Sequence, residues 1–349
     1  MAGLNDRSVG SDDQRVFPSS DPHRPAYHFT PPGNWMNDPN GAIYWNGKYH
    51  LFYQHDLGWP SEVSRKAHWG HAESKDLVHW NDLPVALSPT PNGPDAEGCF
   101  SGNAVNNDGV PTLVYWGVQR GICIATSSDM INWEKSSHNP VIPEPSKPDG
   151  RNILLDKEWR THDPFAWKEG DTWYVISGSQ VGDPRGLGTS RDAAYMFRSP
   201  DLIHWEYMQP LYEPGEESDC AVPDFFQLAD KHMLLFASHT RGAQYYIGDY
   251  SDHQFVPKSH GRMNFTTWDI SSSYSETFES GDLFAPHSWL DSSGRRVMIA
   301  WITEGRSMES QRDAGWSGVM SLPRVLSLQD GCELAIDPLP ELEVLRSEP

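Results

Sequence analysis

The chain has 349 residues, of which 48 are acidic and 27 basic, and its formal net charge is −21. A surface of this charge repels phosphate groups, which argues against a nucleic acid or an anionic membrane as a partner. The length exceeds that of a usual single domain, but all-β propellers and barrels reach it as one unit.

The first part of the chain, residues 1–24, is predicted to be a polar N-terminal extension. Residues 1–14 lack the apolar core of a secretory signal, and no apolar run in the sequence reaches the length of a membrane span. We therefore expect a cytoplasmic protein with no membrane partner, or a secreted one if a leader has been removed. The sequence leaves the oligomeric state open.

Residues 34–41, with the sequence NWMNDPNG, are the most informative segment. Pro39 restrains Asp38 to extended backbone angles, and Asn40-Gly41 tolerates left-handed ones, so we predict a rigid turn that presents the carboxylate. Trp35 and the neighbouring amides are typical of a sugar-binding wall. Asp38 is thus a candidate nucleophile, although turns of this composition are also common without any catalytic role.

Five hairpins recur along the chain, each with a short apolar strand, a polar turn and a second strand rich in aromatic and β-branched residues. Their second strands begin near matched positions that are 63, 61, 59 and 64 residues apart. Such a repeat indicates a radial array, so we predict that residues 25–336 form a five-bladed β-propeller of antiparallel four-stranded blades. Residues 337–349 would be a connector or tail. The matched positions are Lys48, Pro111, Thr172, Lys231 and Arg295.

A second repeat has the pattern Ser-x-Asp-Leu-x-x-Trp and ends at Trp80, Trp133 and Trp205. The three copies fall in the outer parts of blades one, two and three. We expect these tryptophans to pack the outermost strand against its sheet rather than to bind a ligand.

Acids recur at equivalent places in the repeat. Asp38 and Asp163 precede Pro residues at the start of blades one and three, and Glu217 and Asp219 precede the first strand of blade four. Asp282 has a similar place in blade five. The innermost strands start near the channel, so these carboxylates should converge and perturb one another's pKa values. Glycoside hydrolysis uses such a set, although each acid could instead bind backbone amides at a hairpin start.

The remaining composition indicates neither a metal nor another cofactor. The four cysteines, at positions 99, 123, 220 and 332, show no paired spacing, so we expect them to be reduced. The 15 histidines show no metal-ligand spacing either.

Several motifs occur in a characteristic order. Asp163-Pro164 lies where an Arg-Asp-Pro motif would fall, and residues 223–226 (PDFF) are similar to the tail of a Glu-Cys-Pro-Asp motif. From about Tyr27 to Arg346, the chain resembles glycoside hydrolase family 32, which contains invertases, levanases, inulinases and other β-fructosidases. The other matching segments are 34–41, 51–54 (LFYQ), 69–72 leading into 76–80, and 100–102 (FSG).

The resemblance implies a five-bladed propeller that releases fructose from β-fructofuranosides, such as sucrose, fructo-oligosaccharides or fructan, with retention of configuration. Asp38 would attack the anomeric carbon, Asp163 would hold fructosyl hydroxyls and stabilise the transition state, and a blade-four acid would protonate the leaving oxygen. The residues implied to line the fructose pocket are Trp35, Asn37, Gln54, Phe100, Ser101 and His162.

The chain departs from the family pattern at three points. His162 replaces the Arg of Arg-Asp-Pro, which exchanges a bidentate donor for a pH-dependent one. Ala221 stands where the family acid is expected, so we favour Glu217 as the acid, with Asp219 as its rival. Residues 338–346 resemble the connector into the β-sandwich that usually follows the propeller, so we expect either a truncated chain or a natural single-domain form.

Three other functions are compatible with parts of the pattern. A fructosyltransferase would use the same residues and pass fructose to a sugar. A noncatalytic fructan-binding propeller would keep Trp35, Asn37 and Gln54 but lack the acid. A five-bladed arabinan or xylan glycosidase would also surround the axis with acids, but the segment at 34–41 argues against it. Linkage, chain length, and exo or endo action depend on loops at the pocket mouth.

Overall fold

The computed structural model describes residues 21–60, 66–145, 159–181, 190–263, 283–329 and 331–346. The acid predicted in blade five, Asp282, lies outside the described residues. Within these ranges, no helix is long and apolar enough to cross a bilayer.

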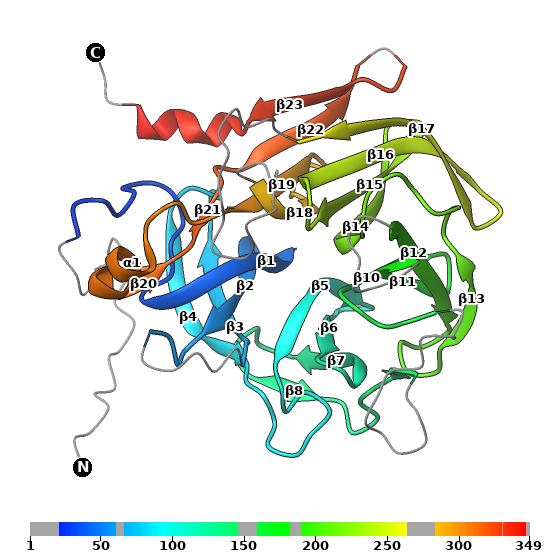
Figure 1. Ribbon diagram of the computed structural model, residues 1–349, viewed down its shortest axis with the longest axis horizontal. Coiled ribbons are helices and arrows are strands. Elements are labelled where there is room, and N and C mark those ends of the chain that lie inside the picture. The colour runs from blue at the N-terminus through cyan, green and yellow to red at the C-terminus, as the bar shows by residue number, and fades with distance from the viewer. Residues whose placement is uncertain are drawn as a thin grey trace.

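Five antiparallel sheets surround a central axis, with β1, β5, β10, β14 and β18 innermost (Figure 1). Blades one and two comprise β1 (Asn34–Trp45), β2 (Lys48–Asp56), β3 (His68–Ser74) and β4 (Trp80–Leu87), then β5 (Cys99–Asn107), β6 (Val110–Gly117), β7 (Gly121–Ser127) and β8 (Trp133–Lys135). Blade three comprises β10 (Pro164–Glu169), β11 (Thr172–Val181), β12 (Arg191–Ser199) and β13 (Glu206–Pro210). Blades four and five comprise β14 (Ala221–Leu228), β15 (Lys231–Ser238), β16 (Gly242–Ser251) and β17 (Gln254–Arg262), then β18 (Leu283–Leu290), β19 (Arg296–Ile302), β22 (Arg324–Leu328) and β23 (Leu334–Pro338).

The predicted propeller of four-stranded blades is confirmed, and each second strand begins within one residue of its predicted position. Two short strands extend blades two and five: β9 (Ile142–Pro143) pairs with β7, and β21 (Val319–Met320) pairs with β19. A third, β20 (Trp316–Ser317), runs parallel to β1 and ties the last part of the chain to blade one. The described residues also form α1 (Met308–Ala314) and the 3-10 helix η1 (Pro340–Leu345).

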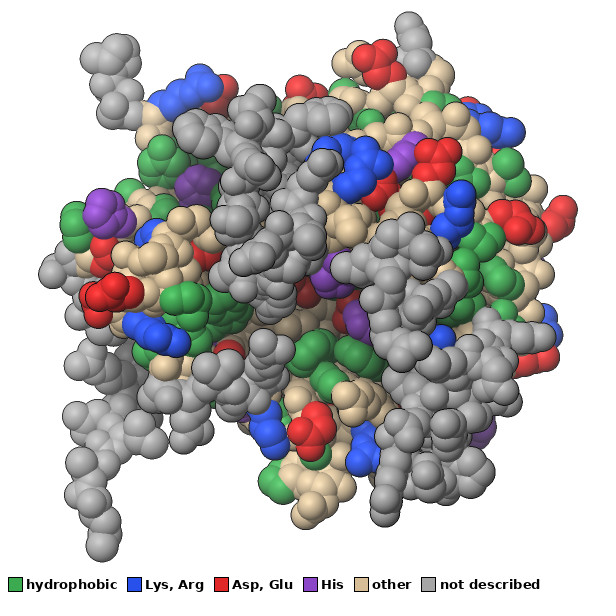
Figure 2. All heavy atoms as spheres, viewed as in Figure 1, with side chains coloured by type: hydrophobic (Ala, Val, Ile, Leu, Met, Phe, Trp, Pro, Cys, Tyr) green, Lys and Arg blue, Asp and Glu red, His purple; other side chains and the backbone are tan. Residues whose placement is uncertain are grey.

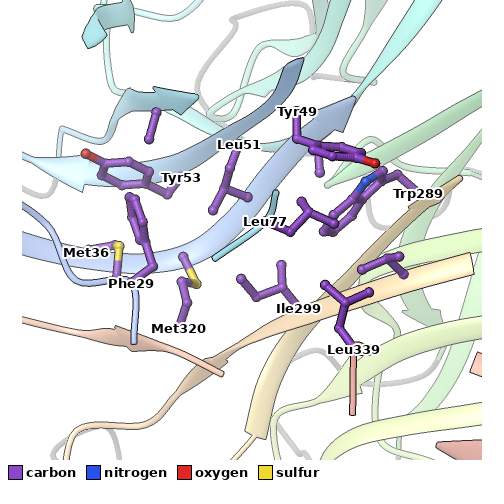
Figure 3. Packing of buried hydrophobic residues seen from close by; sticks show 13 residues of the cluster. Phe29, Met36, Tyr49, Leu51, Tyr53, Leu77, Trp289, Ile299, Met320 and Leu339 are labelled. Atoms are coloured by element: carbon purple, nitrogen blue, oxygen red, sulfur yellow. The ribbon is translucent and has the colours of Figure 1, made fainter. Parts of the chain in front are cut away.

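The hydrophobic core is divided into five clusters, one at each junction between neighbouring blades. Alternation along β15 shows why: Leu234 and Phe236 pack toward blade three, whereas Met233 and Leu235 pack toward blade five. Both faces of the strand are buried, so its sequence reads as a continuous apolar run. Figure 3 shows the cluster between blades five and one, including Leu51 and Trp289.

The Ser-x-Asp-Leu-x-x-Trp repeats are structural, as predicted. In blade one, Ser74 Oγ accepts the Leu77 backbone N–H at 2.8 Å, and Leu77 has a positive φ of 65°. Trp80 Nε1 donates to Leu77 O at 3.2 Å, and its ring packs against the cluster of blades five and one. The same indole bond forms at Trp133 and Trp205. Each Trp therefore secures the outer edge of its blade.

The prediction that Asp38 lies on a turn before the first strand is wrong. Asp38 lies inside β1, where the register with β2 shifts between Met36 and Pro39. An extra residue in one strand bends the backbone and re-aims the side chain. The same shift occurs at equivalent places in β5, β14 and β18. The rigidity expected of a turn is thus supplied by a bulge in an innermost strand.

A ring of polar contacts joins each blade to the next near the axis. We call its side chains the axial ring: Asn40, Asn103, Asp163, Asp224 and His287. Each accepts a backbone N–H from the following blade, as in the bond from Gly102 N to Asn40 Oδ1 at 3.3 Å. The other acceptor bonds are Ala166 N to Asn103 at 2.9 Å, Val222 N to Asp163 at 3.2 Å, Ser288 N to Asp224 at 2.5 Å, and Ala42 N to His287 at 3.2 Å.

Asp224 has the largest number of contacts in the axial ring. Besides the Ser288 backbone, it accepts the Ser288 hydroxyl at 2.9 Å and His287 Nδ1 at 2.9 Å. The carboxylate is 2% exposed, so water cannot replace these bonds. His287 in turn accepts the Ala42 N–H of blade one. One carboxylate thus links blade four to blade five and, through His287, to blade one.

Asp224→Ala should lower the free energy of unfolding by about 3 kcal/mol or more, because it leaves three buried donors without an acceptor. The urea midpoint of unfolding measures this. Asp230→Ala is the matched control, since Asp230 lies six residues away with its side chain 79% exposed. Equal midpoints for the two variants would contradict a stabilising role for the axial ring.

Candidate active site

Asp38 is held by side chains from blades one and two. Its Oδ2 accepts the Ser101 hydroxyl at 2.6 Å, and its Oδ1 accepts Asn37 Nδ2 at 3.1 Å. Gln54 connects the two residues that bind Asp38: its Nε2 donates to Ser101 Oγ at 2.5 Å, and its Oε1 lies 3.4 Å from Asn37 Nδ2. The bulges in β1 and β5 turn Asp38 and Ser101 toward each other. The carboxylate therefore has a fixed orientation.

Burial raises the pKa of Asp38 to about 6. The Ser101 hydrogen bond opposes this shift, and the negative charge of Asp163 adds to it. Asp38 is 8% exposed, so its ionised form is poorly hydrated above pH 6. A desolvated, oriented carboxylate is suited to attack an electrophilic carbon.

Asp163 belongs to both the axial ring and the pocket. Its Oδ2 accepts Val222 N at 3.2 Å and lies 2.9 Å from His162 Nδ1. The His162 ring lies against Trp116, with the ring centroids 4.2 Å apart. Burial lowers the pKa of His162, but the neighbouring charge of Asp163 outweighs it, so the net shift is upward. A histidine whose protonated form is favoured by Asp163 therefore lies beside this acid, at the place of the arginine in the family motif.

Asp219 lies in the segment before β14 and interacts electrostatically with His162, the neighbour of Asp163. Its Oδ1 accepts the Ser218 hydroxyl at 2.8 Å and the His239 backbone N–H at 2.9 Å, and its Oδ2 lies 2.5 Å from His239 Nδ1. Burial raises the pKa of Asp219, but the His239 hydrogen bond and charge make the net shift downward. His239 also interacts electrostatically with Asp163 and His162. Asp38, Asp163 and Asp219 thus share one charged cluster.

Glu217 lies in a different network. Its side chain is 0% exposed, and Oε1 accepts Arg241 Nη1 at 2.6 Å. His260 Nε2 lies 3.5 Å from the same oxygen, and the Glu217 backbone N–H donates to Asp192 Oδ1 at 2.8 Å. These contacts do not bring Glu217 to the pocket acids. Glu217 is therefore enclosed with Arg241 and His260, apart from the cluster of Asp38, Asp163 and Asp219.

Aromatic side chains surround the acids. The Trp35 ring lies 6.1 Å from Trp59 and 6.3 Å from Trp301, and Phe100 lies 5.5 Å from Trp116. The predicted residues Trp35, Phe100 and His162 thus gain partners that the sequence analysis missed. Figure 2 shows acidic and histidine side chains in a hollow at the centre of this face. The missed residues are Trp59, Trp116, His239, Phe284 and Trp301.

Most of the missed residues share a position in the repeat. The second strand of each blade runs back toward the pocket, so its last residues lie beside the start of the first strand. Trp116 and Trp301 lie near the ends of β6 and β19, and His239 follows β15. Gln54, which was predicted, also lies near the end of its second strand, β2. Comparing the ends of the second strands would have found these residues.

An axial pocket is lined by residues that include Asn40, Ser101, Asp163, Pro223, Asp224 and His287. Its polar side chains are Ser101, which donates to Asp38, and four members of the axial ring. In the part of the chain that the structure describes, no three His, Cys, Asp or Glu side chains are grouped to hold a metal ion.

A five-bladed propeller with coupled carboxylates inside an aromatic rim has the features of a glycoside-processing domain. The chain belongs to glycosyl hydrolases family 32, with residues 28–338 matching the N-terminal domain of that family.

Relatives from bacteria and plants align along almost the whole chain. Sucrose-6-phosphate hydrolase of Escherichia coli is 35% identical over 343 residues, which cover 93% of this chain and 66% of the relative. Fructan 6-exohydrolase of Triticum aestivum is 35% identical over 371 residues, covering 93% and 58%. A crystal structure of fructan 1-exohydrolase IIa from Cichorium intybus with 1-kestose gives a TM-score of 0.77 at 28% identity, covering 94% and 63%. The chain spans 57% to 67% of the length of such curated relatives.

Asp38→Asn should stabilise the domain at pH 8 and have little effect at pH 4. Because the pKa of Asp38 is about 6 in the folded protein, against a usual 3.8, ionisation above pH 6 costs folding free energy that asparagine avoids. The shift corresponds to at most about 3 kcal/mol, or a few degrees in Tm. Thermal unfolding at both pH values measures it, with exposed Asp171→Asn as the control. A lower Tm for Asp38→Asn at pH 8 would contradict the desolvation.

Proposed function

We propose that this domain is a retaining glycosidase that releases fructose from terminal β-fructofuranosides through a fructosyl-enzyme intermediate on Asp38. The observation that carries the proposal is the Asp38 carboxylate, desolvated and held by Ser101 and Asn37, in one pocket with Asp163. The names of the relatives support it, since they include sucrose-6-phosphate hydrolase, raffinose invertase and fructan exohydrolase.

Each pocket residue has a role in this reaction. Asp38 attacks the anomeric carbon, and Asp163 binds fructosyl hydroxyls and stabilises positive charge in the transition state. His162, whose protonated form Asp163 favours, donates to the sugar where other family members use arginine. Trp35 and Phe100 provide ring faces for the C–H groups of the sugar. The proton for the leaving group comes from blade four, where Asp219 contacts a pocket histidine, His239.

The central experiment is an assay of fructose release from sucrose, 1-kestose, inulin and levan, with the product anomer identified by NMR. The parent should yield the β-anomer first. Asp38→Asn should lower kcat/KM by at least about a thousand-fold, because the nucleophile is lost. Asp171→Asn, on the exposed turn between β10 and β11, should match the parent.

Three results would redirect the proposal. Activity that survives in Asp38→Asn would remove Asp38 as the nucleophile. Fructose passed to a second sugar would favour the transferase. Binding of a fructan without cleavage by the parent would favour a noncatalytic propeller, consistent with Ala221 at the place of the family acid.

The pH dependence offers a separate check. The acidic limb of kcat/KM should lie near pH 6, since Asp38 must be ionised to attack. Ser101→Ala removes a hydrogen bond that lowers the pKa of Asp38, so the limb should move to higher pH. Ser128→Ala, exposed in the outer turn of blade two, should leave the limb in place. An unshifted limb in Ser101→Ala would show that another group controls it.

A further inference from the structure

His239 is a pocket residue to which neither the family pattern nor the repeat of acids gives a role. It follows the last residue of β15 and comes from blade four. Its side chain keeps 42% of its surface exposed, whereas those of Asp219 and Glu217 keep 11% and 0%. Of the three blade-four candidates for proton transfer, His239 is therefore the one most open to a bound substrate.

The His239 imidazole is oriented from two sides. Its Nδ1 lies 2.5 Å from Asp219 Oδ2, and its backbone N–H donates to Asp219 Oδ1 at 2.9 Å. The Phe284 ring meets it edge-on, with the centroids 5.2 Å apart. Phe284 also contacts Trp301, which lies against Trp35. A series of ring contacts thus connects the imidazole to Trp35, the proposed sugar-binding tryptophan.

The charges around His239 come from three blades. Asp219 of blade four and Asp163 of blade three favour the imidazolium, and His162 of blade three opposes it. Asp38 of blade one also interacts with the His239 charge. Burial lowers the pKa of His239, but its hydrogen bond to Asp219 and these negative charges make the net shift upward. The proton of the His239 and Asp219 pair therefore resides on the imidazole.

We propose that His239 is the proton donor to the leaving group, oriented by Asp219, and that this pair replaces the family's glutamate. The proposal rests on the proposed function, since it requires fructosyl transfer to Asp38. Asp219 has a positioning role: its two oxygens already accept three hydrogen bonds, from Ser218 and His239. Glu217 is shielded from the pocket and paired with Arg241.

The proposed steps balance in charge and in protons. As an Asp38 oxygen bonds to the anomeric carbon, the bond from that carbon to the leaving oxygen breaks, and its electron pair takes the proton from His239 Nε2. A neutral imidazole and an alcohol result. Water then attacks the anomeric carbon, neutral His239 accepts the water proton, and the ester bond to Asp38 breaks. Free fructose, the Asp38 carboxylate and the imidazolium are regenerated.

The test compares two substrates that differ in their need for a proton. A sugar leaving group must be protonated, whereas the fluoride of β-fructofuranosyl fluoride leaves without help. With the natural fructoside that the parent cleaves best, His239→Gln should lower kcat by about a hundred- to ten-thousand-fold. With the fluoride, the loss should be less than about ten-fold. Glutamine keeps an N–H for Asp219 but has no acidic proton.

His204→Gln is the matched control, because His204 forms a similar pair with Asp201, at 2.8 Å, on the outside of blade three. It should match the parent on both substrates.

The basic limb of the pH profile should disappear in His239→Gln. In Asp219→Asn it should move down by about 1–3 pH units, because the charge that favours the imidazolium is gone. Thermal unfolding verifies that each variant is folded.

The alternatives predict different outcomes. Equal losses on both substrates in His239→Gln would indicate a structural role and overturn the proposal. A selective loss on the natural fructoside in Asp219→Asn or Glu217→Gln, with His239→Gln at the parent rate, would assign the proton to that carboxyl instead. A parent protein that cleaves neither substrate would overturn the proposed function, and this inference with it.

Discussion

The axial ring is the contact on which the rest of the molecule depends. Apolar packing between blades is non-directional, so it brings sheets together without fixing how far one slides along the next. The axial hydrogen bonds are directional and run from each blade to its neighbour, including from blade five back to blade one. They hold the bulged first strands in register with one another. The positions of Asp38 and Ser101, on different blades, follow from that register.

Asp163 both stabilises the fold and affects the ionisation of Asp38. The same carboxylate accepts the Val222 backbone N–H, which locates blade four, and raises the pKa of Asp38 across the pocket. Burial destabilises the ionised forms of the pocket acids. When protonated, His162 and His239 offset this effect with their positive charge. An arginine would supply it at any pH, whereas imidazoles do so only when protonated. The chemistry of this pocket is therefore more dependent on pH than one built on arginine.

The architecture was predictable because it is repeated locally. Five hairpins at a near-constant step, with apolar residues on both faces of the second strand, leave few folds besides a propeller. Asn37, Gln54 and Ser101 were found as neighbours of Asp38 through motifs. The bulge at Asp38 was missed because a bulge is defined by the partner strand, which local backbone preferences do not specify. His239, Trp116 and Trp301 were missed because each lies in a different blade, and only the fold brings the ends of these second strands together.

Sequence alone specifies the five blades, the outer tryptophan turns and the identities of Asp38 and Asp163 as the acids of the first and third blades. It favours Glu217 as the blade-four acid but keeps Asp219 as a rival, since both are carboxylates two residues apart in one segment. The folded chain separates them: Glu217 is enclosed with Arg241, and Asp219 meets His239 at the pocket. The role of a carboxylate depends on its burial and on the charges around it. Those neighbours come from the following hairpin and from other blades, so only the three-dimensional arrangement assigns them.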